Sequence, residues 1–441
     1  NFSSAHTSHF WSPVIPSTQW GQNSSRTGPF QSFIHSFIGR GMGTFLAKNG
    51  LASQIGWFYS VQGLVSLCMP ALMGILADRW IQAQRLLSVC HLMAGTFKLF
   101  VCFYALQAQD SLSFAPLFSL YACSVAFFMP TIALSNSVAY TALENEGLDT
   151  VKSFSSIRVW GTIGFIVSMW IVDLGGMQTS PYQFAWSAFL SFILALYART
   201  LPSCPVKRDN GKKTLVQALG LNAFALFRNY RMAVFFVFSM LLGVCLQITN
   251  GFANPFISSF GQIEEYAGTF GVAHANILIS MSQISETLCF LFIPFCLSRF
   301  GIKRVMLIAM LAWALRFLFF AVGNPGEGVW LFVLSMLVYG IAFDFFNISG
   351  SLFVDKETDS SVRSSAQGLF MMMTNGFGAT FGMIIAQMVI NKYVYNLPLD
   401  AAGSDVIQGW TTCWYIFALY ALCIAVAFSF LFSYKHIPNK K

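Results

Sequence analysis

Charge is what this sequence has least of: only 10% of its 441 residues are Asp, Glu, Lys or Arg, whereas 56% are hydrophobic. A soluble domain carries roughly 25% charged residues. A chain of this length with so little charge cannot cover a water-facing surface, and 47 of its residues are Phe. The composition therefore excludes a large soluble protein and predicts a membrane protein with many spanning segments.

Motifs for metal, phosphate or nucleophile chemistry are also absent from the sequence. The ten cysteines form no CxxC pair: nine lie in apolar runs and Cys204 lies in a hydrophilic stretch, and we expect passive packing. The segment "NGFGATFG" (375–382) resembles a nucleotide-binding loop only superficially, because no predicted strand precedes it. Small residues four apart let membrane helices pack closely, and we expect that role here. We therefore expect no enzymatic activity, no metal site and no cofactor.

Long apolar runs are what the sequence has instead. Eleven of them could cross a hydrocarbon core of about 30 Å as helices. They cover residues 55–77, 86–107, 113–140, 154–175, 182–201, 232–257, 273–298, 304–323, 328–354, 364–391 and 410–434. Barrel strands would be about ten residues long and alternating, which nothing here matches. The sequence thus predicts an all-α polytopic membrane protein.

Basic residues predict which connections face the cytoplasm. One set of alternate connections, with the C-terminus, holds Arg79, Arg85, Lys207, Arg208, Lys212, Lys213, Arg228, Arg231, Arg299, Lys303, Arg304, Lys435, Lys440 and Lys441. The opposite set holds Asp110, Glu264, Glu265, Glu327, Asp400 and Asp405, with Lys392 as the main basic exception. This alternation predicts a cytoplasmic C-terminus. It also accounts for the net charge of +8 without a nucleic-acid partner.

A hydrophilic stretch near the middle divides the chain into two parts of similar size. "SCPVKRDNGKK" (203–213) precedes a segment, 214–231, whose apolar spacing predicts an amphipathic helix on the cytoplasmic surface. "PALMGILADRW…R" (70–85) and "PFCLSRFGIKR" (294–304) each end an apolar run before a short basic loop, which suggests duplication. We therefore expect the two six-helix halves of a transporter: an N-terminal bundle over 42–202, a linker over 203–231, a C-terminal bundle over 232–436 and a cytoplasmic tail over 437–441.

The segment before Met42 does not fit this pattern. Residues 1–29 are polar, and "FQSFIHSFIGRGMGTFL" (30–46) holds His35, Arg40 and three glycines. It makes a poor spanning helix and lacks the basic region and clean apolar core of a signal peptide. Because the chain does not begin with Met, our hypothesis is that residues 1–41 are a gene-model artefact or a degraded first helix. Re-sequencing the DNA upstream of the Met42 codon tests it.

Two carboxylates lie deep within apolar runs, where a charge is costly. Asp344 lies about 16 and 10 residues from the two ends of its run, and Glu286 is about equally far from both ends of its own. Polar residues three or four apart share a helix face. Four runs carry such pairs: Arg158 and Thr162, Gln247 and Asn250, Gln283 and Glu286, and Asp344 and Asn347.

We predict that these four pairs line one cavity, because exposing them to lipid would be too costly. The alternative is that these pairs only hold helices together. We expect such a structural role of His91, and also of Lys98 and Arg316, whose side chains are long enough to reach an interface. Two acids against one Arg disfavour an anionic ligand. Gln, Asn and carboxylates favour a neutral polyhydroxylated one. A planar ring could stack on nearby Phe165, Phe343 or Phe346.

Several stretches of the sequence resemble one transporter family closely. They are "MPALMGILADRW" (69–80), "IRVWGTIGF" (157–165), "FFVFSMLLGVCLQITN" (235–250), "SQISETL" (282–288), "YGIAFDFFNISGSLFV" (339–354) and "SAQGLFMMMTNGFG" (365–378). These stretches resemble the bacterial nucleoside:proton symporters of the NupG type, in the major facilitator superfamily, from about Met42 to His436. The resemblance implies twelve helices in two bundles. It also implies nucleoside uptake across the bacterial inner membrane, driven by the proton gradient.

Carried over residue by residue, the resemblance implies a nucleoside site at Arg158, Thr162, Gln247, Asn250, Gln283, Glu286 and Asp344, lined by Phe165 and Phe343. We expect a monomer in the lipid bilayer that takes up uridine, cytidine, adenosine and similar nucleosides. A sugar symporter on the same scaffold and a non-transporting membrane receptor are the alternatives. Asp344 is the expected proton carrier and Glu286 its rival. Two acids near amides could also serve sodium, but the resemblance favours protons.

Overall fold

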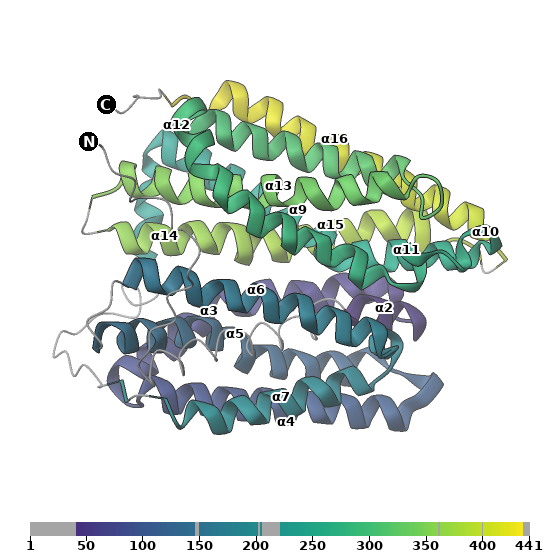
Figure 1. Cartoon of the computed structure of the whole chain (residues 1–441), viewed down its shortest axis with the longest axis horizontal. Coiled ribbons are helices and arrows are strands. Elements are labelled where there is room, and N and C mark those ends of the chain that lie inside the picture. The colour runs from purple at the N-terminus through teal and green to yellow at the C-terminus, as the bar shows by residue number, and fades with distance from the viewer. Residues whose placement is uncertain are drawn as a thin grey trace, which may run out of the picture.

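The computed structural model describes residues 41–145, 150–201, 203–204, 221–359, 362–398 and 400–434. Helices of an N-terminal and a C-terminal bundle lie in two layers (Figure 1). The N-terminal bundle comprises α2 (Gly41–Lys48), α3 (Ile55–Arg79), α4 (Ala83–Ala108), α5 (Phe114–Asn145), α6 (Thr150–Leu174) and α7 (Tyr182–Ala198). The long helices of the C-terminal bundle are α9 (Tyr230–Ser259), α12 (Ala275–Val322), α13 (Val329–Glu357), α15 (Ala379–Ile390) and α16 (Gly403–Leu431).

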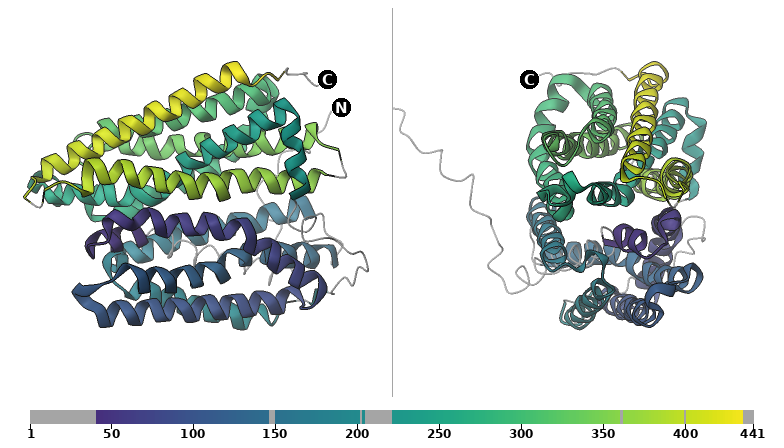
Figure 2. Two further views of the ribbon diagram at one scale, coloured as in Figure 1. Left: turned by 180° about the vertical axis from the view of Figure 1, so that it is seen from behind. Right: turned by 90° about the vertical axis from the view of Figure 1, so that its right-hand side faces the viewer.

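Shorter elements connect these helices. Before and within the N-terminal bundle they are η1 (Ala52–Gln54), η2 (Gln109–Ser111) and η3 (Met177–Thr179). In the second half they are η4 (Leu221–Arg228), η5 (Phe260–Gln262), α10 (Glu264–Ala267), α11 (Phe270–Ala273), α14 (Arg363–Met371) and the π-helices η6 (Met372–Gly378) and η7 (Asn391–Tyr395). An end-on view separates the two groups of helices (Figure 2, right). The described residues are thus helices and their connections, as predicted for an all-α protein.

The eleven predicted apolar runs all fall on helices. Two of them, 273–298 and 304–323, form the single element α12, which contains a sharp break at Gly301. Gly301 has φ 78° and ψ 167°, a conformation that only glycine adopts without strain. Within the described residues, eight helices are long and apolar enough to cross a membrane. The prediction of a polytopic helical membrane protein is confirmed.

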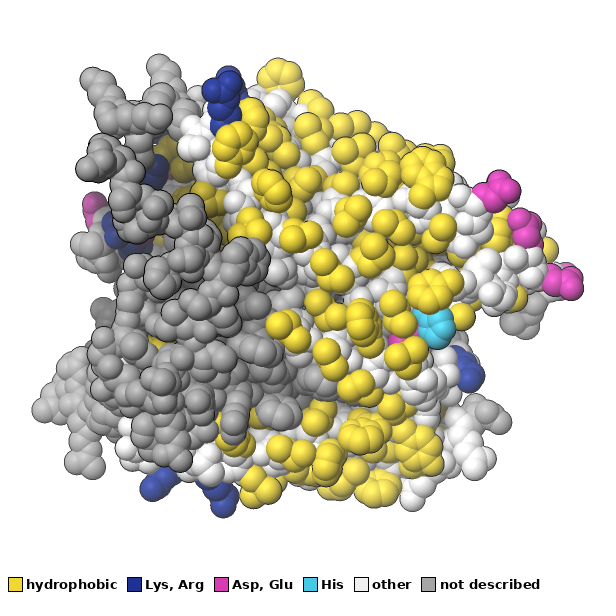
Figure 3. Space-filling model, in the orientation of Figure 1, with side chains coloured by type: hydrophobic (Ala, Val, Ile, Leu, Met, Phe, Trp, Pro, Cys, Tyr) yellow, Lys and Arg dark blue, Asp and Glu magenta, His cyan; other side chains and the backbone are white. Residues whose placement is uncertain are grey.

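The surface matches a lipid environment. Large apolar side chains such as Leu291, Phe295 and Phe430 are 71%, 66% and 81% exposed. Hydrophobic side chains cover much of the face seen in Figure 3, and acidic ones gather at one extremity, beside α10. Exposed apolar patches of this extent mark an interaction surface, and here lipid tails provide the partner.

The glycines of "NGFGATFG" permit close helix packing, as predicted. A Cβ atom at Gly378 would lie 2.5 Å from the carbonyl oxygen of Met240, and one at Gly382 would lie 2.8 Å from the Cα of Val244. Both neighbours belong to α9. Because these neighbours are backbone atoms, only glycine lets η6 and α15 lie so close to α9.

The N-terminal segment and the linker are described only in part. Residues 42–46 ("MGTFL") belong to α2 and are buried between the bundles. Our hypothesis on residues 1–41 otherwise lies outside the described residues, which begin at Gly41. In the linker, the amphipathic helix predicted over 214–231 lies partly outside the described residues, which resume at Leu221. Residues 221–228 form the 3-10 helix η4, and α9 begins at Tyr230 after an Asn229 cap that accepts a hydrogen bond from the Arg231 amide.

Candidate functional site

The predicted site residues lie on helices of both bundles. Arg158, Thr162 and Phe165 belong to α6 of the N-terminal bundle. The others belong to the C-terminal bundle: Gln247 and Asn250 on α9, Gln283 and Glu286 on α12, and Phe343 and Asp344 on α13. A site built from them would therefore span the boundary that moves in a two-bundle transporter.

Two contacts between α6 and α12 set the level of the α6 residues. The Trp170 indole donates a hydrogen bond to the Ser280 hydroxyl at 2.9 Å, and the backbone amide of Asn276 donates to Asp173 at 3.2 Å. The two helices are therefore antiparallel here. With a rise of about 1.5 Å per residue, Phe165 lies at about the depth of Ser285 and Thr162 at about that of Leu288, one on each side of the level of Glu286.

Thr162 and Phe165 are both half-buried. The backbone of Arg158 continues the same helix one turn further on, and its side chain lies outside the described residues. The predicted role of Arg158 therefore stays a prediction.

The α9 pair forms a direct contact. The Asn250 amide donates a hydrogen bond to the Gln247 amide oxygen at 3.5 Å, and both side chains are partly buried. Their spacing of three residues thus places them on one helix face, as predicted. Between them they leave amide donors and acceptors of the kind that bind hydroxyl groups.

The two acids lie on neighbouring helices that pack at backbone distance. A Cβ atom at Gly340 of α13 would lie 2.6 Å from the Ser285 carbonyl oxygen of α12. The Ser285 hydroxyl donates to the Leu337 carbonyl oxygen across the same contact. Cys289, one turn further along α12, lies within electrostatic reach of both Asp344 and Glu286. Asp344 and Glu286 therefore lie on two helices that pack closely against each other, and their joint role in one site stays a prediction.

The two acids differ in exposure. Asp344 is 2% exposed, whereas Glu286 is half-buried. A carboxyl that is withdrawn from water and one that is partly open to it can take different roles. The sequence placed both at similar depth and did not distinguish them in this respect.

An aromatic pocket lies next to Asp344, whose chain neighbour Phe343 lines it. It is lined by Leu242, Gly243, Leu246, Trp313, Ala342, Phe343, Phe346, Asn347, Thr374 and Asn375. Of the predicted aromatic residues, Phe343 and Phe346 line it, and Phe346 also packs against Phe235 with ring centroids 6.2 Å apart. The Asn347 amide donates to the Phe343 carbonyl oxygen at 2.9 Å. Sequence reasoning missed Trp313, because an aromatic residue in such Phe-rich runs gives no distinguishing signal.

The buried cations Lys98 and Arg316, for which a structural role was expected, do not use their length to reach an interface. They are 2% and 1% exposed within their bundles. Lys98 donates to the Ser191 hydroxyl at 3.2 Å and lies 4.7 Å above the Phe128 ring. Arg316 donates to the Ser335 carbonyl oxygen at 2.5 Å. Internal acceptors and aromatic faces replace water for both groups.

A polar network joins the two bundles at the α10 end. The carboxylate of Asp173 on α6 pairs with the His274 ring at 2.7 Å and also accepts a hydrogen bond from Gln178. Asn254 of α9 donates to Gln178 at 3.3 Å and to Asn276 at 2.5 Å. Sequence reasoning missed this network, because Asp173 and His274 lie at the ends of predicted runs, where polar residues are ordinary.

A second strip of contacts at the same end joins α3 to α15. The Gln387 amide oxygen accepts a hydrogen bond from the Gly56 backbone at 2.6 Å, and its nitrogen donates to the Ala52 carbonyl oxygen at 3.2 Å. Asn391 donates to the Ser53 carbonyl oxygen at 3.1 Å. The bundles are therefore tied together on two sides of this end.

Comparisons with known proteins point in one direction. The family model described as nucleoside H+ symporter matches residues 31–437, and so begins before Met42, where the resemblance in the sequence starts. The xanthosine permease of Escherichia coli (strain K12) is 48% identical over 389 residues, which are 88% of this chain and 89% of that protein. The nucleoside permease NupG of the same organism is 48% identical over 386 residues, 87% of this chain and 88% of that protein.

A solved structure agrees with the architecture. The crystal structure of the nucleoside transporter NupG has a TM-score of 0.84 and 44% identity, over 95% of this chain and 100% of that chain. The two-bundle arrangement predicted from the sequence is thereby confirmed as a major-facilitator transporter fold.

Proposed function

Because the chain belongs to the nucleoside H+ symporter family, we propose that it takes up nucleosides together with protons by alternating access between its two bundles. The observation that carries this proposal is the close packing of α12 and α13, which carry Glu286 and Asp344, with an aromatic pocket lined by Phe343 next to Asp344. An intramembrane carboxyl group can carry the proton, and an aromatic wall can stack on the base of a neutral nucleoside. Its energy source is the proton gradient, with no cofactor.

The substrates are nucleosides such as uridine, cytidine and adenosine. Relatives named xanthosine permease and nucleoside permease support this class. Gln247, Asn250, Gln283 and Glu286 bind the sugar hydroxyls or base edges through paired donors and acceptors. Phe343 and Phe165 present aromatic faces to the base, a contact that is worth about 1–3 kcal/mol per base in other settings.

Asp344 is the proton carrier in this proposal, and Glu286 contributes to substrate binding. The low exposure of Asp344 supports the assignment, because a proton carrier must not exchange its proton freely with water on both sides of the membrane. Arg158 of the opposite bundle is the cation that the deprotonated carboxylate seeks. The protonated and charged states then favour different bundle arrangements, which is the coupling that symport requires.

The protein works as a monomer in the bacterial inner membrane with its C-terminus in the cytoplasm. The distribution of basic residues supports this orientation. The α10 end, which carries Glu264 and Glu265, then faces outward. The Asp173 network at that end closes the outward path, and uptake of each nucleoside requires the network to open.

Counterflow in proteoliposomes tests the proposal. Vesicles preloaded with unlabelled uridine should accumulate radiolabelled uridine, and vesicles preloaded with glucose should not accumulate labelled glucose. An imposed inward proton gradient, but not a sodium gradient, should drive net uridine uptake. Glucose counterflow would indicate the sugar symporter. Uridine binding without any counterflow would indicate a membrane receptor.

A further inference from the structure

A buried arginine joins the neighbouring helices α12 and α13 behind the aromatic pocket. Arg316, in the second part of α12, is 1% exposed and donates to the Ser335 carbonyl oxygen of α13 at 2.5 Å. In return, the Ser335 hydroxyl donates to the Arg316 carbonyl oxygen at 3.0 Å. This reciprocal pair fixes α13 against α12 one turn before Tyr339.

The arginine also contacts the ring of Tyr339 directly. Its guanidinium carbon lies 4.7 Å above the Tyr339 ring, and a second contact places it 5.4 Å from the Phe320 ring. A guanidinium on an aromatic face is attractive, and the attraction grows where water is excluded. Arg316 therefore fixes both the position of the helix that carries Tyr339 and the orientation of its ring.

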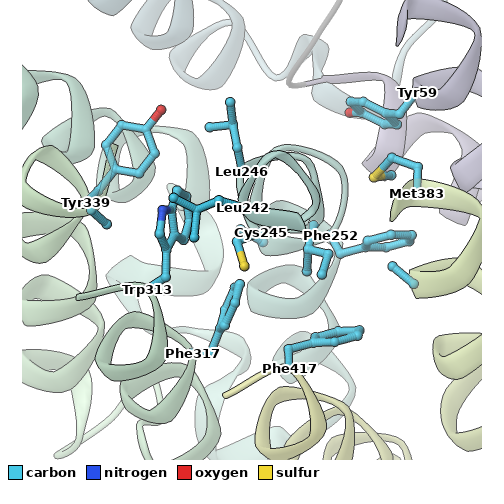
Figure 4. Packing of buried hydrophobic residues seen from close by; sticks show 14 of the residues in the cluster. Tyr59, Leu242, Cys245, Leu246, Phe252, Trp313, Phe317, Tyr339, Met383 and Phe417 are labelled. Atoms are coloured by element: carbon cyan, nitrogen blue, oxygen red, sulfur yellow. The ribbon is translucent and has the colours of Figure 1, made fainter. Parts of the chain in front are cut away.

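Tyr339 in turn contacts two rings that line the pocket. The Phe343 ring stacks parallel to it, with centroids 5.6 Å apart and planes 9° apart. The Trp313 ring meets it edge-on at 6.0 Å and 87°. Figure 4 shows Tyr339 and Trp313 next to each other, with Leu242 and Leu246 of α9 alongside. Phe343 and Trp313 are therefore supported by one ring, which Arg316 holds.

We propose that Arg316 is a positioning residue for nucleoside selection. It acts through Tyr339 to hold Phe343 and Trp313 in one arrangement before the substrate arrives. Rings that are already ordered cost less entropy on binding, and their fixed separation favours one size of base over another. This inference rests on the proposed function, because it needs Phe343 to contact the nucleoside.

A purely structural role does not account for this choice of side chain. Removing a guanidinium from water is costly, and well-packed apolar side chains of similar volume often replace buried charges without loss of stability. A methionine at position 316 would fill the space between α12 and α13. It would lack both the fork that binds the Ser335 carbonyl and the cation above Tyr339.

The test compares Arg316→Met with a matched control, Lys98→Met. Lys98 is also a buried cation 4.7 Å above an aromatic ring, but it lies in the other bundle, away from the site. Binding of labelled uridine and of labelled adenosine to the purified full chain is measured, together with the melting temperature. Arg316→Met should weaken uridine binding about two- to thirtyfold and change the uridine-to-adenosine affinity ratio. Lys98→Met should leave both affinities unchanged, whatever its effect on melting.

Two further variants keep the outcome decisive. Arg316→Lys retains the cation but not the planar fork, so it should bind uridine more tightly than Arg316→Met yet keep an altered ratio; it also replaces Arg316→Met if that variant fails to fold. An unchanged ratio in the Arg316 variants, or an equal change in Lys98→Met, overturns the positioning role. If Phe343→Ala leaves both affinities unchanged, the proposed nucleoside site itself fails. If Phe343→Ala weakens binding and the Arg316 variants do not, only the present inference fails.

Discussion

Asp344 places a nearly water-free carboxyl group in a helix whose neighbouring residues are Phe343, Phe345 and Phe346. The packing around it requires Gly340, which lets α13 lie against the backbone of α12. Burying a carboxyl group at membrane depth is costly, and a neutral amide would serve equally well for hydrogen bonding alone. We therefore expect Asp344 to change its protonation state during transport.

Asp344→Asn tests that role, since Asn mimics the protonated carboxyl in every step of the cycle. The variant should bind uridine and exchange it in counterflow, but it should not accumulate uridine against a gradient. The measurement is net uptake driven by an imposed pH gradient in proteoliposomes. If the variant still concentrates uridine, the proton is carried elsewhere and Glu286 becomes the residue to test.

Gln283→Ala tests the binding role of the α12 pair. Removing one partner from a buried hydrogen-bonded contact costs about 1–3 kcal/mol, which is roughly 5- to 150-fold in affinity. Uridine affinity should fall by that order, measured by binding to the purified protein. Thr96→Ala is the control, because Thr96 lies on α4 of the other bundle and its hydroxyl donates to the Leu92 carbonyl oxygen of its own helix at 2.9 Å. Unchanged affinity in both Gln283→Ala and Glu286→Gln would reject the site.

At the residue scale, the sequence predicts contacts between residues that are three or four positions apart on one helix. The spacing of Gln247 and Asn250 implies one helix face, and the two side chains do form a hydrogen bond. The sequence does not predict the partner of Asp173, because that partner, His274, lies 101 positions away in the chain. A contact of that kind depends on how the bundles dock, which no local pattern encodes. For the same reason the sequence did not indicate which ring Arg316 contacts, which is that of Tyr339.

At the scale of elements, apolar run length predicts the spanning helices well, because the bilayer requires each one to satisfy its backbone internally. The linker follows no such rule. The 214–231 segment has helical apolar spacing; its described residues form the short 3-10 helix η4 (Leu221–Arg228) and the start of α9 at Tyr230. Outside the hydrocarbon core, water and neighbouring helices can satisfy the backbone in more than one way. Periodicity alone is therefore a weaker guide there.

Gly340→Ala should separate α12 from α13. The new Cβ would lie 2.6 Å from the Ser285 carbonyl oxygen, so the helices must move apart. Overpacking of this kind costs about 1–3 kcal/mol. We expect a lower melting temperature and a loss of uridine uptake, because both acids lie on these helices. The control is Gly368→Ala on α14, where a Cβ meets nothing within 4 Å. A variant at Gly340 with wild-type melting and uptake would contradict the close packing.

At the scale of the whole molecule, the two bundles must separate at the α10 end if uptake uses alternating access. Cross-linking tests this requirement directly. Asp173→Cys and His274→Cys are combined in a background whose ten native cysteines are replaced by alanine. A short bifunctional thiol reagent should abolish uridine counterflow in the double variant, and cleavage of the linker should restore it. Each single variant, treated in the same way, is the control. Continued counterflow with the cross-link in place would show that this end does not open.

The geometry of the Asp173 network has a mechanical consequence. α6 has 25 residues and is therefore about 38 Å long, so its end lies about 19 Å from a fulcrum at mid-depth. On such a lever, a tilt of about 3° moves the end by about 1 Å, which stretches the 2.7 Å contact of Asp173 with His274 beyond hydrogen-bonding range. Because hydrogen bonds act over so short a distance, those of this network break after a small tilt of one bundle relative to the other. The network therefore stabilises the conformation in which this end is closed. Once its hydrogen bonds are broken it no longer opposes the motion of the bundles, so the transition is abrupt rather than gradual.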